Sequence, residues 1–203
     1  MFLEKLFNFG KIYIIKLKKF MIIKLNQGDF MYKKKYFAVM ASHRKNKNTD
    51  KALKEYIEKL EAEGNYVEKV DLLDYEIEIC KSCYYCTRNF KSCILKDDMQ
   101  FFYKKFEEYD NYIFATPVYF NNVSTLAKIM IDRCQMLYGA NTFFDKSFKE
   151  VKNKGEAVII STAGAPSYDD QFKGVESTLR LVFKNLNAEI VEHIKISNTD
   201  VDL

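Results

Sequence analysis

The stretch YFAVMASHRKNKNT, residues 36–49, joins an apolar run to a polar loop and then to the start of a helical pattern. The run 36–40 predicts a buried strand, because a strand covered on both faces is apolar throughout. Apolar residues then recur at helical spacing over 49–63, and Gly64 is a typical helix stop. A strand that leads through a polar loop into a helix is the opening unit of an α/β fold.

The same alternation continues along the chain. Further strands are predicted over 66–70, 112–115, 157–160 and 190–196, and further helices over 97–109, 124–138 and 169–185. This order favours one domain, 31–203, with a parallel five-stranded sheet covered on both faces. Only residues 197–203 follow the last strand, so the final helix that packs beside the first strand in such folds is expected to be missing or truncated.

Composition excludes several classes of protein. The chain has 203 residues, 48% of them apolar, with 7 Gly and 2 Pro, which rules out a disordered or collagen-like chain. Five cysteines are too few for a secreted disulfide scaffold, and no export signal precedes them. Unpaired thiols without an export signal predict a cytoplasmic protein.

Residues 1–30 hold six lysines and two acidic residues, and so carry the whole net charge of +4. A neutral body with a basic tip lacks the basic face that nucleic acid requires. Lysines interrupt the apolar residues of 1–30 every few positions, so no uncharged run approaches the ~20 residues of a transmembrane span. A basic amphipathic segment lying on a membrane surface remains one interpretation of 1–30.

Two other interpretations of this N-terminal extension are open. The codons for Gly28 and Asp29 can resemble a ribosome-binding site placed just before Met31, so that translation starts at Met31 and 1–30 is a mis-assigned start. Alternatively, the apolar residues of 1–30 cover the sheet face that the final helix leaves open.

Three polar or kinked strand exits, 42–49, 116–124 and 161–167, are expected at the carboxyl edge of the sheet, where α/β folds bind ligands. In the first, Ser42 and Arg44 suit a phosphate monoester, and the N-terminus of the next helix adds free N–H groups. Asn48 and Thr49 either join this phosphate site or simply cap the helix. The loop has neither GxxxxGK[ST] nor GxGxxG, so no P-loop or dinucleotide fingerprint is present.

The segment ASHRKNKNT, 41–49, resembles the phosphate loop of the NADPH-dependent FMN reductase and iron–sulfur flavoprotein families. TPVYF, 116–120, followed by Lys128 and the Asp132-Arg133 pair, resembles their second signature, and Asp97-Asp98-Met99 resembles a third. The resemblance covers 36 to about 166 in the right order. It implies a flavodoxin-like, doubly wound sheet of order 2-1-3-4-5 that binds FMN.

Carried over residue by residue, the resemblance assigns the phosphate contacts to Ser42, Arg44, Asn48 and Thr49. It assigns the isoalloxazine ring to Pro117, Val118, Tyr119, Phe120 and Asn121, with Thr162, Ala163 and Gly164 completing the site. No side chain is expected to act as an acid or base, because the flavin carries the chemistry. The chain departs from the family at His43 for Pro, Lys47 for Gly, and Asn121-Asn122 for the commoner Gly-(Ser/Asn).

The cysteines form a compact motif, CxxCxxCx₆C, within an insertion at about 79–96. Its members are Cys80, Cys83, Cys86 and Cys93. Bacterial ferredoxins use the same CxxCxxC opening, and the iron–sulfur flavoproteins hold a 4Fe–4S cluster near FMN on a similar motif. Free thiols and a zinc site are the alternatives, although structural zinc more often uses two separated CxxC knuckles. The fifth cysteine, Cys134, is predicted to be a buried small hydrophobe.

Other residues are assigned structural roles. His193 is predicted to be structural on its strand, His43 to face solvent in the first loop, and the Asp132-Arg133 pair to form a helix-end or interface salt bridge. Tyr84 and Tyr85 are expected to pack.

The resemblance implies an FMN-dependent oxidoreductase, most like an iron–sulfur flavoprotein, that takes electrons from a ferredoxin-like or NAD(P)H donor. An NAD(P)H-dependent FMN or quinone reductase without a cluster is the second interpretation. A flavodoxin-like carrier, or a thiol- or zinc-binding module, is the third. By the same resemblance the chain is expected to form a homodimer or homotetramer.

Overall fold

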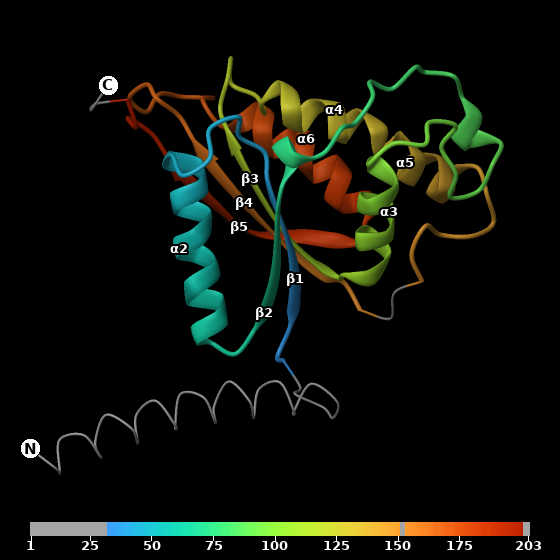
Figure 1. Cartoon of the computed structure of the whole chain (residues 1–203), viewed down its shortest axis with the longest axis horizontal. Helices are drawn as coiled ribbons and strands as arrows, with labels where there is room; N and C mark the ends of the chain where they lie inside the picture. The colour runs from blue at the N-terminus through green and yellow to red at the C-terminus, as the bar shows by residue number, and fades with distance from the viewer. Residues whose placement is uncertain (1–31, 151–152, 201–203) are drawn as a thin grey trace, which may run out of the picture. The chain divides into compact units, whose positions relative to one another are not determined.

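One parallel sheet of five strands forms the centre of the computed structural model, which describes residues 32–150 and 153–200 (Figure 1). The chain divides into two units, Met1–Lys33 and Lys34–Leu203, and every element below belongs to the second. The predicted N-terminal extension, 1–30, lies outside the described residues. The strands are β1 Lys35–Met40, β2 Tyr66–Asp71, β3 Asn111–Pro117, β4 Gly155–Thr162 and β5 Ala188–Ile196.

The strand order, β2-β1-β3-β4-β5, confirms the predicted flavodoxin-like topology. β1 and β3 are apolar and almost wholly buried, as strands covered on both faces must be. Met40 of β1 lies beside Ala115 of β3, and Pro117 beside Thr162 of β4. The carboxyl ends of these three strands therefore meet at one edge of the sheet.

The helices cover both faces unequally (Figure 1). Their bounds are α2 Asn48–Ala62, α3 Met99–Glu108, α4 Thr125–Arg133, α5 Gln135–Thr142 and α6 Lys173–Asn185, with short 3₁₀ turns η1 Leu72–Asp74 and η2 Tyr85–Thr87. A large core that includes Phe102, Leu137 and Leu179 lies between the sheet and α3, α4, α5 and α6. A smaller core, with Leu53 at its centre, lies under α2.

The helix predicted over 124–138 is two helices, so that prediction was wrong. α4 begins at Thr125, where Ser124 accepts a hydrogen bond from the N–H of Ala127, and it ends at Arg133, with Cys134 as its C-cap. The Arg133 carbonyl accepts the Tyr103 hydroxyl at 2.8 Å, while the N–H of Leu137 bonds to Cys134. The break follows from a tertiary hydrogen bond, which apolar periodicity does not report.

Two helices also begin later than predicted. α6 begins at Lys173 rather than 169, because Asp170 has a left-handed backbone with φ +70° that cannot belong to a helix. α3 begins at Met99 rather than 97, and the carboxylates of Asp97 and Asp98 instead accept N–H groups of Glu78 and Glu76. The two residues before α3 thus hold the segment at Glu76 and Glu78 instead of extending the helix.

No helix among residues 32–150 and 153–200 combines the length and apolarity needed to cross a bilayer.

Candidate functional site

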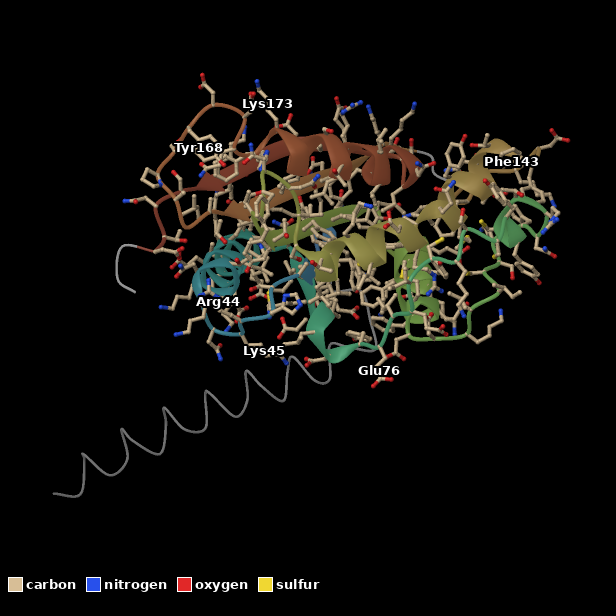
Figure 2. The ribbon with its side chains drawn as sticks, turned by 90° about the horizontal axis from the view of Figure 1, so that it is seen from above. Arg44, Lys45, Glu76, Phe143, Tyr168 and Lys173 are labelled. Atoms are coloured by element: carbon tan, nitrogen blue, oxygen red, sulfur yellow. The ribbon has the colours of Figure 1, made fainter. Side chains whose placement is uncertain are left out.

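The three loops predicted to share one edge of the sheet do so, and we call this region the three-loop edge: 42–49, 116–124 and 161–167. In the first loop, Ser42 is buried and its hydroxyl accepts the N–H of Arg44 at 3.1 Å, while the Arg44 side chain is exposed. Figure 2 shows Arg44 and Lys45 beside α2. Lys47 has φ −103°, so the position where the family has Gly does not need glycine's conformational freedom.

Asn48 and Thr49 do more than end a loop. Lys47 is the N-cap of α2, and its side chain makes no capping hydrogen bond. Asn48 donates its side-chain amide to the Thr199 carbonyl at 3.0 Å. The hydroxyl oxygens of Thr49 and Thr162 lie 2.5 Å apart and both residues are buried, so this contact ties the first loop to the third.

Asp50 was not identified from the sequence. It is buried, and its carboxylate accepts the N–H of Asn46 at 2.8 Å and pairs with Lys54 and Lys69, each at 3.0 Å. Burial alone would raise the pKa of Asp50, but these hydrogen bonds and charges outweigh it and lower the pKa. The signal for it is an acidic residue in the first turn after a polar loop, which is typical of helix N-termini.

The second loop makes a tight turn at its tip. The backbones of Tyr119 and Asn122 exchange hydrogen bonds, and the two residues between them, Phe120 and Asn121, have φ of +49° and +61°. Asparagine tolerates this left-handed conformation well, which explains Asn121 where the family favours Gly. Phe120 is fully exposed at the turn.

The N-terminal end of helix α6 packs directly against this turn. A Cβ on Gly174 would collide with the Asn121 carbonyl, so only glycine allows the approach. The Tyr168 hydroxyl also bonds to the Asn121 side chain. Between the second and third loops, the N–H of Val118 donates to the Thr162 carbonyl at 2.8 Å.

The third loop is covered by residues 197–200. Thr199 donates both its N–H and its hydroxyl to the Ala163 carbonyl, each at 3.1 Å, and Asn198 donates to Ala165. The carboxylate of Asp200 lies where a Cβ of Gly164 would be. Direct contacts thus join the three loops at one edge of the sheet: Thr49 of the first loop and Val118 of the second both contact Thr162 of the third.

The cysteine segment, which we define as residues 79–96, is a second region. Cys80, Cys83, Cys86 and Cys93 line one cavity of about 450 Å³ together with Arg133, Tyr138 and Phe143. All four thiols are free. Within the described residues, no three His, Cys, Asp or Glu side chains are placed to hold a metal ion. Figure 2 shows Phe143 at the opposite end of the unit from Arg44.

Two side chains outside the cysteine segment hold its ends: Arg133, which is buried, and Asp97, which is partly buried. Asp97 pairs with Arg133 at 2.5 Å and accepts the N–H of Glu78 at 2.7 Å. In the middle, the Cys86 carbonyl lies against Gly139 of α5, where a Cβ would come within 2.8 Å of the carbonyl oxygen. Burial raises the pKa of the Cys86 thiol, which therefore loses its proton less readily than a free thiol until a cation binds it.

Among the residues with predicted structural roles, two predictions were wrong and one is confirmed. Asp132 and Arg133 do not pair with each other: Asp132 pairs with Lys128 on the surface, and Arg133 is buried against Asp97. The prediction that Tyr84 packs was wrong, because 68% of it is exposed. Cys134 is buried as predicted, which raises the pKa of its thiol to about 12.

The two histidines lie where they were predicted. His43 is exposed in the first loop. His193 lies in β5, with its ring 2.9 Å from the Ser161 hydroxyl and 3.2 Å from the Glu176 carboxylate.

Comparison with known proteins adds sequence relatives. The model of the NADPH-dependent FMN reductase family matches residues 35–199. An iron-sulfur flavoprotein of Archaeoglobus fulgidus is 36% identical over 102 residues, which are 50% of this chain and 49% of that protein. Another, from Methanosarcina thermophila, is 31% identical over 107 residues, which are 53% and 56%. The chain spans about half the length of the curated relatives it matches.

Solved structures agree on the fold. An NAD(P)H:quinone oxidoreductase from Methanothermobacter marburgensis has a TM-score of 0.62 at 15% identity, covering 84% of this chain and 87% of that chain. An FMN-dependent NADH-azoreductase from Bacillus anthracis, solved with FMN, has a TM-score of 0.56 at 15% identity, covering 83% and 89%. At this identity the likeness concerns the fold alone.

Proposed function

The chain belongs to the NADPH-dependent FMN reductase family, and on that premise we propose that it is an FMN-dependent oxidoreductase whose cofactor binds at the three-loop edge. The observation that carries this proposal is the pair of contacts on Thr162. Its hydroxyl meets Thr49 of the first loop, and its carbonyl meets Val118 of the second. These contacts hold three separate stretches of backbone side by side, and this supports a site for one ligand that touches all three, as a nucleotide with a flat ring would.

The roles within the site follow from the chemistry of each loop. Ser42, Arg44, Asn48 and Thr49, with the N-terminus of α2, would hold the phosphate, since free N–H groups and a cation suit an anion. Residues Pro117 to Asn121 and Thr162 to Gly164 would hold the ring, whose apolar faces suit aromatic side chains and whose polar edge suits backbone groups. Bound FMN supplies transfer of a hydride or of single electrons.

The cysteine segment would hold a 4Fe–4S cluster on Cys80, Cys83, Cys86 and Cys93. Four thiols on one cavity are the donor set that such clusters use, and each thiol binds a different iron. The names of the curated relatives also favour a cluster. The cluster would supply single electrons.

The electron donor and the assembly are part of the same proposal. A ferredoxin-like protein or NAD(P)H would serve as the donor, and the protein would act in the cytoplasm. Arg44 and Phe143 lie at opposite ends of the described unit (Figure 2), so a homodimer or homotetramer can bring the cluster of one copy toward the FMN of another.

A reductase without a cluster is the second candidate. Within the described residues, the thiols are not gathered around a point that would hold a metal ion, and the structural neighbours are named as quinone oxidoreductase and azoreductase. In this case NAD(P)H would reduce FMN directly.

Anaerobic purification separates the candidates. Protein that carries FMN together with iron and sulfide in equal amounts, and absorbs broadly at the blue edge of the visible spectrum in addition to the flavin peaks, supports the cluster. Flavin without iron, bleached quickly by NADPH, supports the reductase. Protein that stays colourless after soaking with FMN contradicts both and supports a carrier or a thiol or zinc module.

The location of the flavin is tested by two neighbouring variants and two ligands. Arg44→Gln should weaken FMN binding by about tenfold or more, since a hydrogen bond to a charged group contributes roughly 1.5–3 kcal/mol. The same variant should leave riboflavin binding unchanged, because riboflavin lacks the phosphate. His43→Gln, one residue away, is the matched control. Equal losses for both ligands would contradict the assignment of Arg44 to the phosphate.

A further inference from the structure

Arg133 is a cation built into the wall of the cysteine cavity. It is the last residue of α4, and only 1% of its side chain is exposed. Its two terminal nitrogens bind both carboxylate oxygens of Asp97, at 2.5 and 3.0 Å, and one of them also donates to the Glu78 carbonyl at 2.9 Å. This forked geometry fixes the guanidinium plane.

One nitrogen of this group reaches a cysteine. The Nη2 atom of Arg133, which also binds Asp97, lies 3.5 Å from the Sγ atom of Cys93. The Nε atom is buried and has no hydrogen-bond partner among the described residues. A buried donor without a partner carries a desolvation cost. The guanidinium can therefore donate one more hydrogen bond, from Nε, to an acceptor in the cavity.

The charge on Arg133 is permanent. The guanidinium of arginine stays protonated in folded proteins, and the Asp97 carboxylate beside it favours the charged form. A buried charge is also screened less by salt than a surface charge is.

Other cations approach the cysteine segment differently. Arg88 donates to the Cys83 carbonyl at 3.4 Å and Lys96 to the Cys93 carbonyl at 3.2 Å, and both side chains are exposed. These two cations reach backbone oxygen, whereas Arg133 reaches sulfur. Arg88 is therefore a matched control for Arg133: it has the same side chain, and among the residues that the structure describes its hydrogen bond to the motif goes to a backbone carbonyl and not to a sulfur.

We propose that Arg133 is a positioning residue that donates a hydrogen bond to the Cys93 sulfur when this cysteine ligates the cluster, and that it thereby raises the reduction potential of the cluster. This inference rests on the proposed function. Hydrogen bonds to ligand sulfurs and nearby charge are main determinants of cluster potentials. Reduction adds negative charge to the cluster, so a fixed buried cation stabilises the reduced form more than the oxidised form.

The first test is a potentiometric titration of the cluster in the full chain with FMN bound. In Arg133→Lys, the loss of the fork should lower the reduced-to-oxidised ratio at a fixed solution potential by about tenfold, which is about 59 mV for one electron. Arg88→Lys should leave the ratio near that of the wild type. Equal ratios in the wild type and Arg133→Lys, or equal shifts in both variants, would overturn the inference.

A second measurement needs no change at Arg133 and decides the matter if Arg133→Lys assembles no cluster. Protein grown with guanidino-¹⁵N arginine is reduced and examined by pulsed EPR, which detects nitrogen hydrogen-bonded to a cluster ligand. An ¹⁵N coupling that persists in Arg88→Lys supports the inference. A reduced cluster without that coupling overturns it. Wild-type protein without iron and sulfide contradicts the proposed cluster itself, which is a different and separately visible result.

Discussion

The three-loop edge and the cysteine segment are built in different ways. The three-loop edge is formed by the ends of adjacent parallel strands, and its loops contact one another directly, as Thr49 contacts Thr162. The cysteine segment has little regular structure, with only η2 within it, and side chains from other elements hold it. Asp97 and Arg133 secure its ends and Gly139 supports its middle. One site thus depends on the fold as a whole, and the other on a few buried residues.

The largest expected difference between the two regions follows from a change at Asp97. In Asp97→Asn the buried Arg133 loses its counter-charge, and removing one partner of a buried ion pair costs roughly 3–5 kcal/mol. We expect a lower midpoint in urea unfolding and loss of iron, while protein that remains folded still binds FMN. Asp98→Asn is the control, since its exposed carboxylate accepts the N–H of Glu76 without an arginine partner. Similar destabilisation by both variants would mean that the ion pair is not what secures the segment.

A smaller disturbance of the cysteine segment comes from Gly139→Ala. The new methyl group would meet the Cys86 carbonyl at 2.8 Å, and overpacking of this kind costs about 1–3 kcal/mol. We expect Cys86 to move outward and the thiols to react faster with a disulfide reagent, with FMN affinity unchanged. Thr142→Ala, at the exposed end of α5, should change neither rate nor affinity. An equal loss of FMN affinity in Gly139→Ala would show that the two regions are coupled.

The three-loop edge is tested in the same way by Thr49→Val. The variant keeps the shape of the side chain and removes the hydroxyl that contacts Thr162, at a cost of about 0.5–1.5 kcal/mol for a lost hydrogen bond. FMN should bind up to about tenfold more weakly, and iron content should not change. Thr125→Val, at the exposed start of α4, is the control. Unchanged FMN titration curves for Thr49→Val would show that this contact does not support the flavin site.

The smallest expected effect is a pH dependence at His193, whose ring bonds to Ser161 next to Thr162. Burial lowers the pKa of His193, outweighing its hydrogen bond to Glu176, and Lys195 lowers it further. The unfolded chain therefore binds the proton more readily, and the free energy of unfolding should fall as pH drops below about 6.5, the ordinary pKa of histidine. The hydrogen bond from His193 also lowers the pKa of Glu176. Glu176 therefore reduces the free energy of unfolding only when the pH falls below about 4.5, the ordinary pKa of this carboxyl group, so it does not affect a comparison made at higher pH.

Urea unfolding at pH 7.5 and pH 5.5 measures this difference. His193→Gln should show a smaller difference between the two pH values than the wild type. His43→Gln, which removes the exposed histidine, should match the wild type. A wild-type protein that becomes more stable at pH 5.5 would contradict the expected direction of the change.

The fold was predictable because the sequence of each buried strand is apolar, and this pattern can be recognised locally. The run 36–40 is apolar throughout and became β1, and strand order followed from the family resemblance. The shared location of the three loops was also predictable, because the carboxyl ends of parallel strands meet at one edge of the sheet. The contacts within them were not, because Thr49 meets Thr162 across 113 residues and nothing in either local pattern signals it.

The contacts that hold the cysteine segment were harder to predict from the sequence. Arg133 follows directly on Asp132, which suggested that these neighbours pair, yet its partner Asp97 is 36 residues away. The same tertiary contacts explain the break at Cys134, because the Arg133 carbonyl is taken by Tyr103. Periodicity records which face of a helix is covered, and it does not identify the partner that covers it.

The turn at Phe120 has a practical consequence. The chain contains no tryptophan, and Phe120 projects fully into solvent at the tip of the second loop. Phe120→Trp keeps an aromatic ring on the same left-handed backbone and gives the protein a single indole. Its fluorescence would then report on events at one known position, so a dye-free optical titration of this loop can be made with one substitution.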